Sequence, residues 1–457
     1  MTLQISFWSA AGPTPVTAEC ITVVSLLLTG WLLGGIASGF CAAVLYATYP
    51  LAVQQGMMYY PTAFQVASIA AAIALVVVAE RADGNRRLGL SLAAGFCLGV
   101  GYLFKEDVAI VVAAVAVAAV VAGFPRLSSA FALCAGAALV FGAESIAYWT
   151  LTGSPTFRLT STSGLGFASQ DNLRIGSIYH WDAYLRSLWA VPVQVGIVWW
   201  LSIPALWAVL RERSRGTGGK GLVFIAAVFV LVFAYLQFGT GSFSSYAPLP
   251  KTPRYTALVT PILMLLVGAW IARLLHLRRR VGATVLTTAI AAAIPCIVFL
   301  AISSSERSRN TLALLPALDR FNNAALYTDY YGLRLIRVLD SDMPDIRMWY
   351  HAKFDTNQIF VNANPESGSL VLLDRQMAKI YTSSYEMTLP PSIDHPPATW
   401  SVVWQHRAYG EGSFPRRVLE SARSVLARFP DLPLNKRIAS SIAEIIEGDD
   451  ATLYRVP

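Results

Sequence analysis

The sequence predicts a mainly α-helical protein, with a polytopic bundle of about ten transmembrane helices in residues 1–302 and a small α/β domain in residues 303–457. Of its 457 residues, 55% are hydrophobic and only 14% are charged, and the mean hydropathy is +0.52. These values lie outside the usual range of soluble domains. Apolar segments recur up to about Leu300, whereas charged residues and prolines dominate from Ser303 onward. This change in composition predicts the boundary between the two domains.

The apolar segments of the first domain are long enough to cross a hydrocarbon core of about 30 Å as helices. We expect these helices at roughly 16–30, 31–51, 62–79, 88–104, 108–124, 129–150, 186–210, 221–238, 255–275 and 281–302. The five cysteines all lie in or beside these segments, at Cys20, Cys41, Cys97, Cys134 and Cys296. Their spacing predicts neither a disulfide framework nor a zinc site, and we expect no metal site.

The basic residues of the connecting loops predict which way the bundle faces, because Lys and Arg accumulate on the cytoplasmic side. One set of alternate loops contains Arg81, Arg86, Arg87, Arg126, Arg211, Arg213, Arg215, Lys220, Arg273, Arg278, Arg279 and Arg280. The other loops contain Lys105, Arg158, Arg174, Lys251 and Arg254. We therefore expect the N-terminus, the turn at Lys105 and the C-terminal domain on the external side. The same rule explains the net charge of +8 without a nucleic-acid partner.

The C-terminal domain alternates between strand and helix patterns. We expect strands at 324–329, 369–374, 400–404 and 451–456, and helices at 331–339 and 414–428. No glycine-rich phosphate fingerprint follows any of these strands, so the pattern offers no nucleotide site.

Three consecutive charges, Lys105, Glu106 and Asp107, interrupt the apolar sequence after a glycine-rich segment. On the same predicted side of the membrane, Arg254 follows Lys251 and opens another helix. Cations at a membrane boundary suit a phosphate group, because Lys and Arg donate charge-assisted hydrogen bonds to its oxygens. A lipid phosphate with its tail between helices is the expected ligand. The alternative is that Lys105 and Arg254 only anchor helix ends at the interface.

Several short motifs accompany these charges. They are Tyr49-Pro50, Pro61 at the start of a helix, the glycine-rich run 94–99 leading to Lys105-Glu106, and Pro253-Arg254-Tyr255 followed by Pro261. Together they resemble the GT-C glycosyltransferases of the dolichyl-phosphate-mannose protein mannosyltransferase type, which use polyprenyl-phosphate-linked sugars as donors. The resemblance implies that Lys105 and Arg254 bind the phosphate of the lipid carrier and that Tyr255 lines this site. By loop position alone it implies the same for Arg158 and Arg174.

The resemblance also implies a general base, an acidic residue in the first external loop between the first two helices. No residue of this chain matches that position, and we expect the N-terminal helix and first external loop to be missing or supplied elsewhere. An inverting transfer needs a carboxylate that takes the proton of the acceptor hydroxyl. The external acids present are Glu106, Asp107, Asp171 and Asp182. The sequence singles out none of them.

The sequence therefore predicts a membrane glycosyltransferase that moves a hexose or pentose from a polyprenyl-phosphate carrier to a glycan, lipid or protein on the external face. We expect it in a bacterial plasma membrane. One alternative is a non-catalytic or truncated relative that binds lipid-linked sugar or serves as a partner subunit. Another is a lipid or sugar transporter, a class that places ionisable residues in broken helices. The sequence specifies neither the sugar, nor the acceptor, nor whether a divalent metal takes part.

Overall fold

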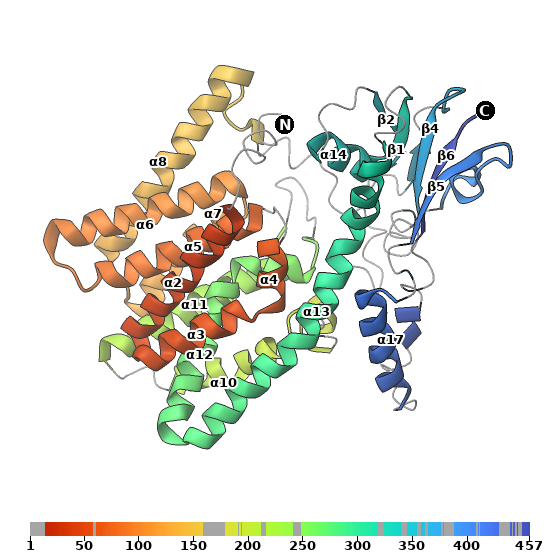
Figure 1. The fold of residues 1–457 in the computed structure, drawn as a ribbon. Coiled ribbons are helices and arrows are strands. Elements are labelled where there is room, and N and C mark those ends of the chain that lie inside the picture. Colours follow the sequence, from red (N-terminus) through yellow and green to blue (C-terminus); the bar gives the residue numbers. More distant parts are fainter. Residues whose placement is uncertain are drawn as a thin grey trace. The chain divides into compact units, whose positions relative to one another are not determined.

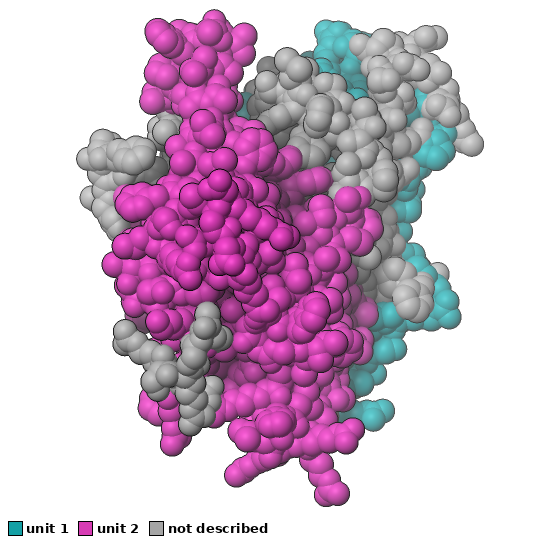
Figure 2. Space-filling view, turned by 90° about the vertical axis from the view of Figure 1, so that its left-hand side faces the viewer, with its two compact units in different colours: residues 1–9, 301–457 teal, residues 10–300 magenta. Residues whose placement is uncertain are grey.

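A computed structural model (Figure 1) describes residues 14–457 apart from 58–60, 159–178, 191, 193, 212–215, 241–247, 319–323, 340–344, 354–357, 362–363, 376–377, 379–387, 408–409, 411, 429–438, 441, 444–445 and 447–449. The chain forms two compact units, Ala10–Leu300 and Ala301–Pro457, which Figure 2 shows in different colours.

The first unit is a bundle of apolar helices. Its elements are α2 (Thr14–Gly34), α3 (Ile36–Ala47), α4 (Pro50–Met57), α5 (Pro61–Ala79), α6 (Gly84–Phe104), α7 (Val108–Ala122), α8 (Leu127–Thr152), the π-helix η2 (Leu185–Ala190), α10 (Val198–Arg211), α11 (Gly216–Phe238), the 3-10 helix η3 (Pro253–Leu258), α12 (Thr260–Leu277) and the start of α13 (Arg279–Leu318). Among the described residues, seven helices are long and apolar enough to span a membrane, and α3, α7 and α10 are shorter apolar helices. The chain is thus a multi-pass membrane protein, and these helices match the ten segments expected from the sequence.

The helices α6 and α8 pack with their backbones in contact. A Cβ atom at Gly95 of α6 would overlap the carbonyl oxygen of Leu133, and one at Gly136 of α8 would overlap that of Leu92. Small residues permit this close approach, which is a common way for helices to associate in membranes. The glycines that precede Lys105 in the sequence therefore have a packing role.

Polar contacts mark the two ends of the bundle. At one end, Ser129 at the start of α8 donates a hydrogen bond to Glu80 after α5 (2.6 Å), and Arg126 lies 3.9 Å from the same carboxylate. At the other end, Arg158 after α8 contacts the carbonyl oxygen of Leu103 in the last turn of α6 (3.2 Å). The two sets of basic loops that the sequence distinguishes are thus represented at opposite ends of α8.

The second unit contains one mixed six-stranded sheet. Its elements are β1 (Leu326–Asp329), α14 (Tyr330–Leu339), β2 (Ile346–Lys353), β3 (Gln358–Val361), β4 (Leu370–Asp374), α16 (Pro391–Asp394), β5 (Ser401–Arg407), α17 (Phe414–Ala427) and β6 (Asp450–Arg455). The strand order is β3-β2-β1-β4-β6-β5, with β1 parallel to both β2 and β4 and the other pairs antiparallel. This confirms the predicted small α/β domain. Strands β2 and β3 were not predicted from the sequence pattern.

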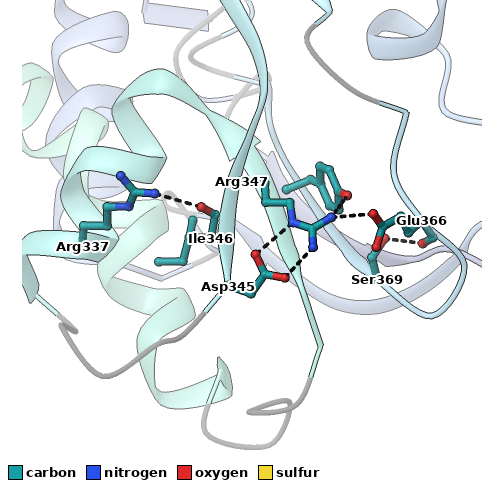
Figure 3. A network of polar contacts seen from close by, with 7 residues as sticks. Arg337, Asp345, Ile346, Arg347, Glu366 and Ser369 are labelled. Atoms are coloured by element: carbon teal, nitrogen blue, oxygen red, sulfur yellow. Dashed lines mark hydrogen bonds and ion pairs between the residues drawn. The ribbon is translucent and has the colours of Figure 1, made fainter.

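The sheet is stabilised by apolar clusters and by a polar network around Arg347. Tyr327 and Val371 belong to one apolar cluster, whereas their neighbours Leu326 and Leu370 belong to another that includes Leu314 of α13. Arg347 of β2 joins several segments at the surface (Figure 3), because its guanidinium contacts Asp345 (2.8 Å), Glu366 (2.6 Å) and the hydroxyl of Tyr327 (2.8 Å). This network is a structural feature of the α/β unit and lies outside the bundle.

Candidate functional site

The turn between α6 and α7 is the centre of the candidate site. Helix α6 ends at Phe104, and Lys105 then adopts an extended conformation while its backbone N–H still bonds to the carbonyl oxygen of Gly101 (3.0 Å). Helix α7 begins at Val108. The three charged side chains of the turn have different partners. Those of Lys105 and Asp107 contact each other, whereas that of Glu106 lies near Arg158.

Lys105 contacts one carboxylate and one aromatic ring. Its Nζ lies 3.1 Å from Oδ2 of Asp107 and 4.6 Å from the centre of the Tyr255 ring. The side chains of Lys105 and Asp107 are 25% and 29% exposed, so solvent or a ligand can reach both. A cation over an aromatic face is attracted by the ring quadrupole, which helps to hold the ammonium in place.

Arg254 reaches the same aromatic ring from η3. Its guanidinium carbon lies 5.0 Å from the centre of the Tyr255 ring, and its Nη2 donates a hydrogen bond to the Tyr255 hydroxyl (3.3 Å). Arg254 is exposed and Tyr255 is half-buried. The loop charges predict Lys105, Arg254 and Tyr255 on one side of the membrane, and the structure brings all three together.

Arg158 forms a second cluster beside the turn. Its guanidinium lies 2.5 Å from Glu144 of α8 and 3.5 Å from Glu106, and it covers the ring of Tyr102 at 5.1 Å. Burial alone would lower the pKa of Arg158, but the hydrogen bond to Glu144 and the charges of both carboxylates raise it above its ordinary value. Arg158 is therefore a permanently charged group that is already engaged with two acids.

The remaining acidic candidate of the described loops is held by other partners. Asp182 contacts His180, and its carboxylate lies 3.2 Å from Nε of Arg186. The hydrogen bond with His180 and the charge of Arg186 lower the pKa of Asp182 below its ordinary value. No described contact links Asp182 with Lys105 or Arg254. Asp171 and Arg174 lie outside the described residues.

Three further residues, Tyr184, Tyr235 and Lys251, were not predicted as site residues from the sequence. Electrostatic interactions link Asp107 with Tyr184, which directly precedes η2, and with Tyr235 of α11. Buried Lys251 donates hydrogen bonds to the carbonyl oxygens of Tyr179 (3.1 Å) and Leu249 (3.3 Å), and burial lowers the pKa of its ammonium. These residues lack a local sequence signal, because each meets its partners only through the packing of distant segments.

The described part of the chain contains no group of three or more His, Cys, Asp or Glu side chains arranged to hold a metal ion.

Comparison with known proteins adds evidence about the fold. No model of a known protein family matches the chain, and no curated protein sequence matches it. Among solved structures, ArnT from Cupriavidus metallidurans bound to undecaprenyl phosphate matches with a TM-score of 0.52 and 12% identity, covering 85% of this chain and 81% of that chain. The chain has the GT-C fold.

Two structures from Archaeoglobus fulgidus also match this chain. An oligosaccharyltransferase in complex with Zn and sulfate has a TM-score of 0.49 and 12% identity, covering 96% of this chain and 76% of that chain. The oligosaccharyltransferase AglB, in complex with an inhibitory peptide and a dolichol-phosphate, has a TM-score of 0.44 and 13% identity, covering 72% of this chain. The present chain spans about half of AglB, 52% of its length. At these identities the likeness concerns the fold, and roles for individual residues must be argued from the geometry.

Proposed function

We propose that the protein is a membrane glycosyltransferase that takes a hexose or pentose from a polyprenyl-phosphate carrier and transfers it to an external acceptor. Lys105 and Arg254 would bind the phosphate of the carrier, and Tyr255 would line its site. The observation that carries this proposal is the meeting of both cations on one tyrosine ring, at 4.6 Å and 5.0 Å from its centre.

These two cations form a suitable pair for a phosphate. The two distances to the shared ring place their charges no more than about 10 Å apart, close to the Debye length at physiological salt. Like charges at this separation repel, and a phosphate between them replaces repulsion by attraction on both sides. The Lys105 ammonium has three N–H groups, and Asp107 is its one described ion-pair partner, so donors remain for a ligand.

The fold supports the same class of ligand. ArnT, which shares the fold, was solved with undecaprenyl phosphate bound. A long isoprenoid tail needs an apolar surface, and a multi-pass helix bundle offers one next to its charged end. We propose a bacterial plasma membrane as the location, with the Lys105 turn and the α/β unit on the external side.

Binding of undecaprenyl phosphate to the full chain in lipid nanodiscs tests the phosphate site. Each of Lys105→Ala and Arg254→Ala removes a charge-assisted contact, so we expect each to weaken binding by about 10-fold to 100-fold. Arg126→Ala is the control, because Arg126 lies at the opposite end of α8 beside Glu80, and its affinity should equal that of the wild type.

The dependence on salt provides a second measurement. Affinity of the wild type should fall as ionic strength rises, and each alanine variant should show a shallower dependence. Equal binding by the wild type and both alanine variants would exclude a phosphate site at Lys105 and Arg254. Binding without transfer of sugar to any acceptor would instead favour a non-catalytic relative.

A further inference from the structure

The proposed transfer needs a proton acceptor, and the described residues of the bundle include few acids that are available for this role. Glu106 and Glu144 both contact Arg158, and Asp182 contacts His180 and Arg186. Asp107 differs from these acids, since its single described partner is Lys105, one of the two cations proposed to bind the phosphate. Building on the proposed function, we infer that Asp107 is the carboxylate that accepts the proton of the acceptor hydroxyl.

The position of Asp107 relative to the proposed phosphate site supports this inference. Its Oδ2 lies 3.1 Å from the Lys105 ammonium, so a phosphate on that ammonium lies within a few ångströms of the carboxylate. The anomeric carbon of the donor sugar is bonded directly to a phosphate oxygen. The carboxylate is thus close to the atom that the acceptor hydroxyl must attack, and its side chain is 29% exposed, so the acceptor can reach it.

Structural roles do not account for this carboxylate. An aspartate directly before a helix usually accepts hydrogen bonds from the first helical N–H groups. Asp107 occupies this position before α7, yet its side chain makes no such bond. Its remaining structural contact is a partly exposed ion pair with Lys105, and exposed pairs contribute little to stability. The chain therefore gains little stability from a carboxylate at this position.

The surroundings of Asp107 include a buried tyrosine, Tyr184. Tyr184 is only 1% exposed, and within the described part of the chain its hydroxyl has no hydrogen-bond partner. Burial, and then the charges of Tyr255 and Asp107, raise the pKa of Tyr184 above its ordinary value. Tyr184 therefore keeps its proton and cannot accept the one that the acceptor hydroxyl loses.

The proposed transfer forms one bond to the anomeric carbon and breaks another. The acceptor oxygen attacks the anomeric carbon and forms the new C–O bond, while the bond from that carbon to the phosphate oxygen breaks. The electron pair of the broken bond remains on the phosphate, which leaves as polyprenyl phosphate with its charge held by Lys105 and Arg254. The proton of the acceptor hydroxyl moves to a carboxylate oxygen of Asp107. General bases of this kind contribute about 100-fold to 10,000-fold to the rate.

The test separates binding from transfer in the full chain. Membranes that contain the wild type, Asp107→Asn, Asp107→Glu or Glu106→Gln are supplied with a panel of radiolabelled polyprenyl-phosphate hexoses and pentoses and with cell-envelope material as the source of acceptors. Affinity for undecaprenyl phosphate is measured on the same proteins in nanodiscs. Glu106→Gln is the matched control, because the adjacent acid contacts Arg158 and not Lys105.

We expect Asp107→Asn to lose transfer by about 100-fold or more while its affinity for undecaprenyl phosphate stays within about 3-fold of the wild type. Asp107→Glu keeps a carboxylate and should transfer at least about 10-fold faster than Asp107→Asn. Glu106→Gln should stay within about 5-fold of the wild type. If Asp107→Asn loses both binding and transfer, Asp107 only positions Lys105, and the inference is wrong.

Two further outcomes also count against the inference. The first is a transfer rate of Asp107→Asn within about 10-fold of the wild-type rate, and the second is an equal loss of transfer rate in Glu106→Gln. Either result would mean that a group other than Asp107 accepts the proton of the acceptor hydroxyl. If the wild type itself neither binds undecaprenyl phosphate nor transfers any sugar of the panel, the proposed function fails and the inference fails with it. The wild type thus distinguishes a failure of the function from a failure of the residue assignment.

Discussion

Arg158 and Lys105 are cations at the same end of the bundle, yet their surroundings differ. Arg158 is 14% exposed and lies between Glu144 and Glu106, so the cluster carries an excess of negative side chains around one guanidinium. Lys105 is 25% exposed and has one carboxylate beside it. Breaking a buried ion pair leaves an uncompensated charge, whereas removing a more exposed cation costs little. Arg158 is therefore expected to stabilise the fold, and Lys105 to serve a ligand.

Replacing Arg158 by Met should lower the midpoint temperature of unfolding, because Glu144 and Glu106 would face each other without a cation. We expect a loss of about 2 kcal/mol or more. In the double variant Arg158→Met/Glu144→Gln one of the two charges is removed, and part of the stability should return. Thermal unfolding of the wild type, Arg158→Met, Glu144→Gln and the double variant in one detergent measures this coupling. A midpoint equal to that of the wild type in Arg158→Met would show that the cluster has no structural role.

The sequence predicted part of this site and not the rest, for physical reasons. The alternation of basic loops placed Lys105 and Arg254 on one side, because topology follows from charge and hydropathy alone. The partners of Arg158 lie 14 and 52 residues away along the chain, and no local pattern reports such a pairing. Tyr184 and Tyr235 also have no local pattern that marks them as site residues. Tyrosines near a membrane boundary are commonly interfacial residues.

At the scale of elements, contact between α6 and α8 sets the position of the Lys105 turn. Gly95 and Gly136 allow the two helices to meet backbone to backbone. Arg158 then joins the last turn of α6 to the segment after α8. The turn is thus fixed by packing along the helices and by an ion cluster at their ends.

Two glycines of α8 provide a matched test of this packing. A Cβ atom at Gly136 would overlap the backbone of Leu92, whereas at Gly142 no atom lies within 4 Å of a Cβ atom. We therefore expect Gly136→Ala to destabilise the protein by about 1 to 3 kcal/mol. Gly142→Ala should leave stability equal or slightly higher, because alanine favours the helix by about 0.5 to 1 kcal/mol. Midpoints of thermal unfolding compare the two. A smaller loss in Gly136→Ala than in Gly142→Ala would contradict the close approach of α6 and α8.

At the scale of the whole molecule, the ten apolar helices were predictable because each one is a long uniform segment with a local signal. Strands β1 and β4 were predictable for a similar reason, since every residue in them is buried. Strand β2 was not predictable in this way, because Arg347 interrupts its apolar residues and Lys353 ends it. Its place in the sheet also depends on pairing with β1 and β3. Orientation in the membrane is a further property of the whole chain, and it follows from the charges of the loops.

Labelling of single cysteines in right-side-out membrane vesicles tests this orientation. In a background with Cys20→Ala, which removes the exposed native thiol, a membrane-impermeant maleimide is applied to three variants. Asn85 lies in the first turn of α6, beside Arg86 and Arg87. Pro155 lies near Arg158 in sequence, and Ser421 lies on α17. All three positions are exposed. By the distribution of basic residues, Pro155→Cys and Ser421→Cys should react in sealed vesicles, and Asn85→Cys should react only after permeabilisation. The reverse pattern would place the Lys105 turn in the cytoplasm, where an external acceptor cannot reach it. Protection of Ser421→Cys alone would place the α/β unit on the side opposite to the candidate site.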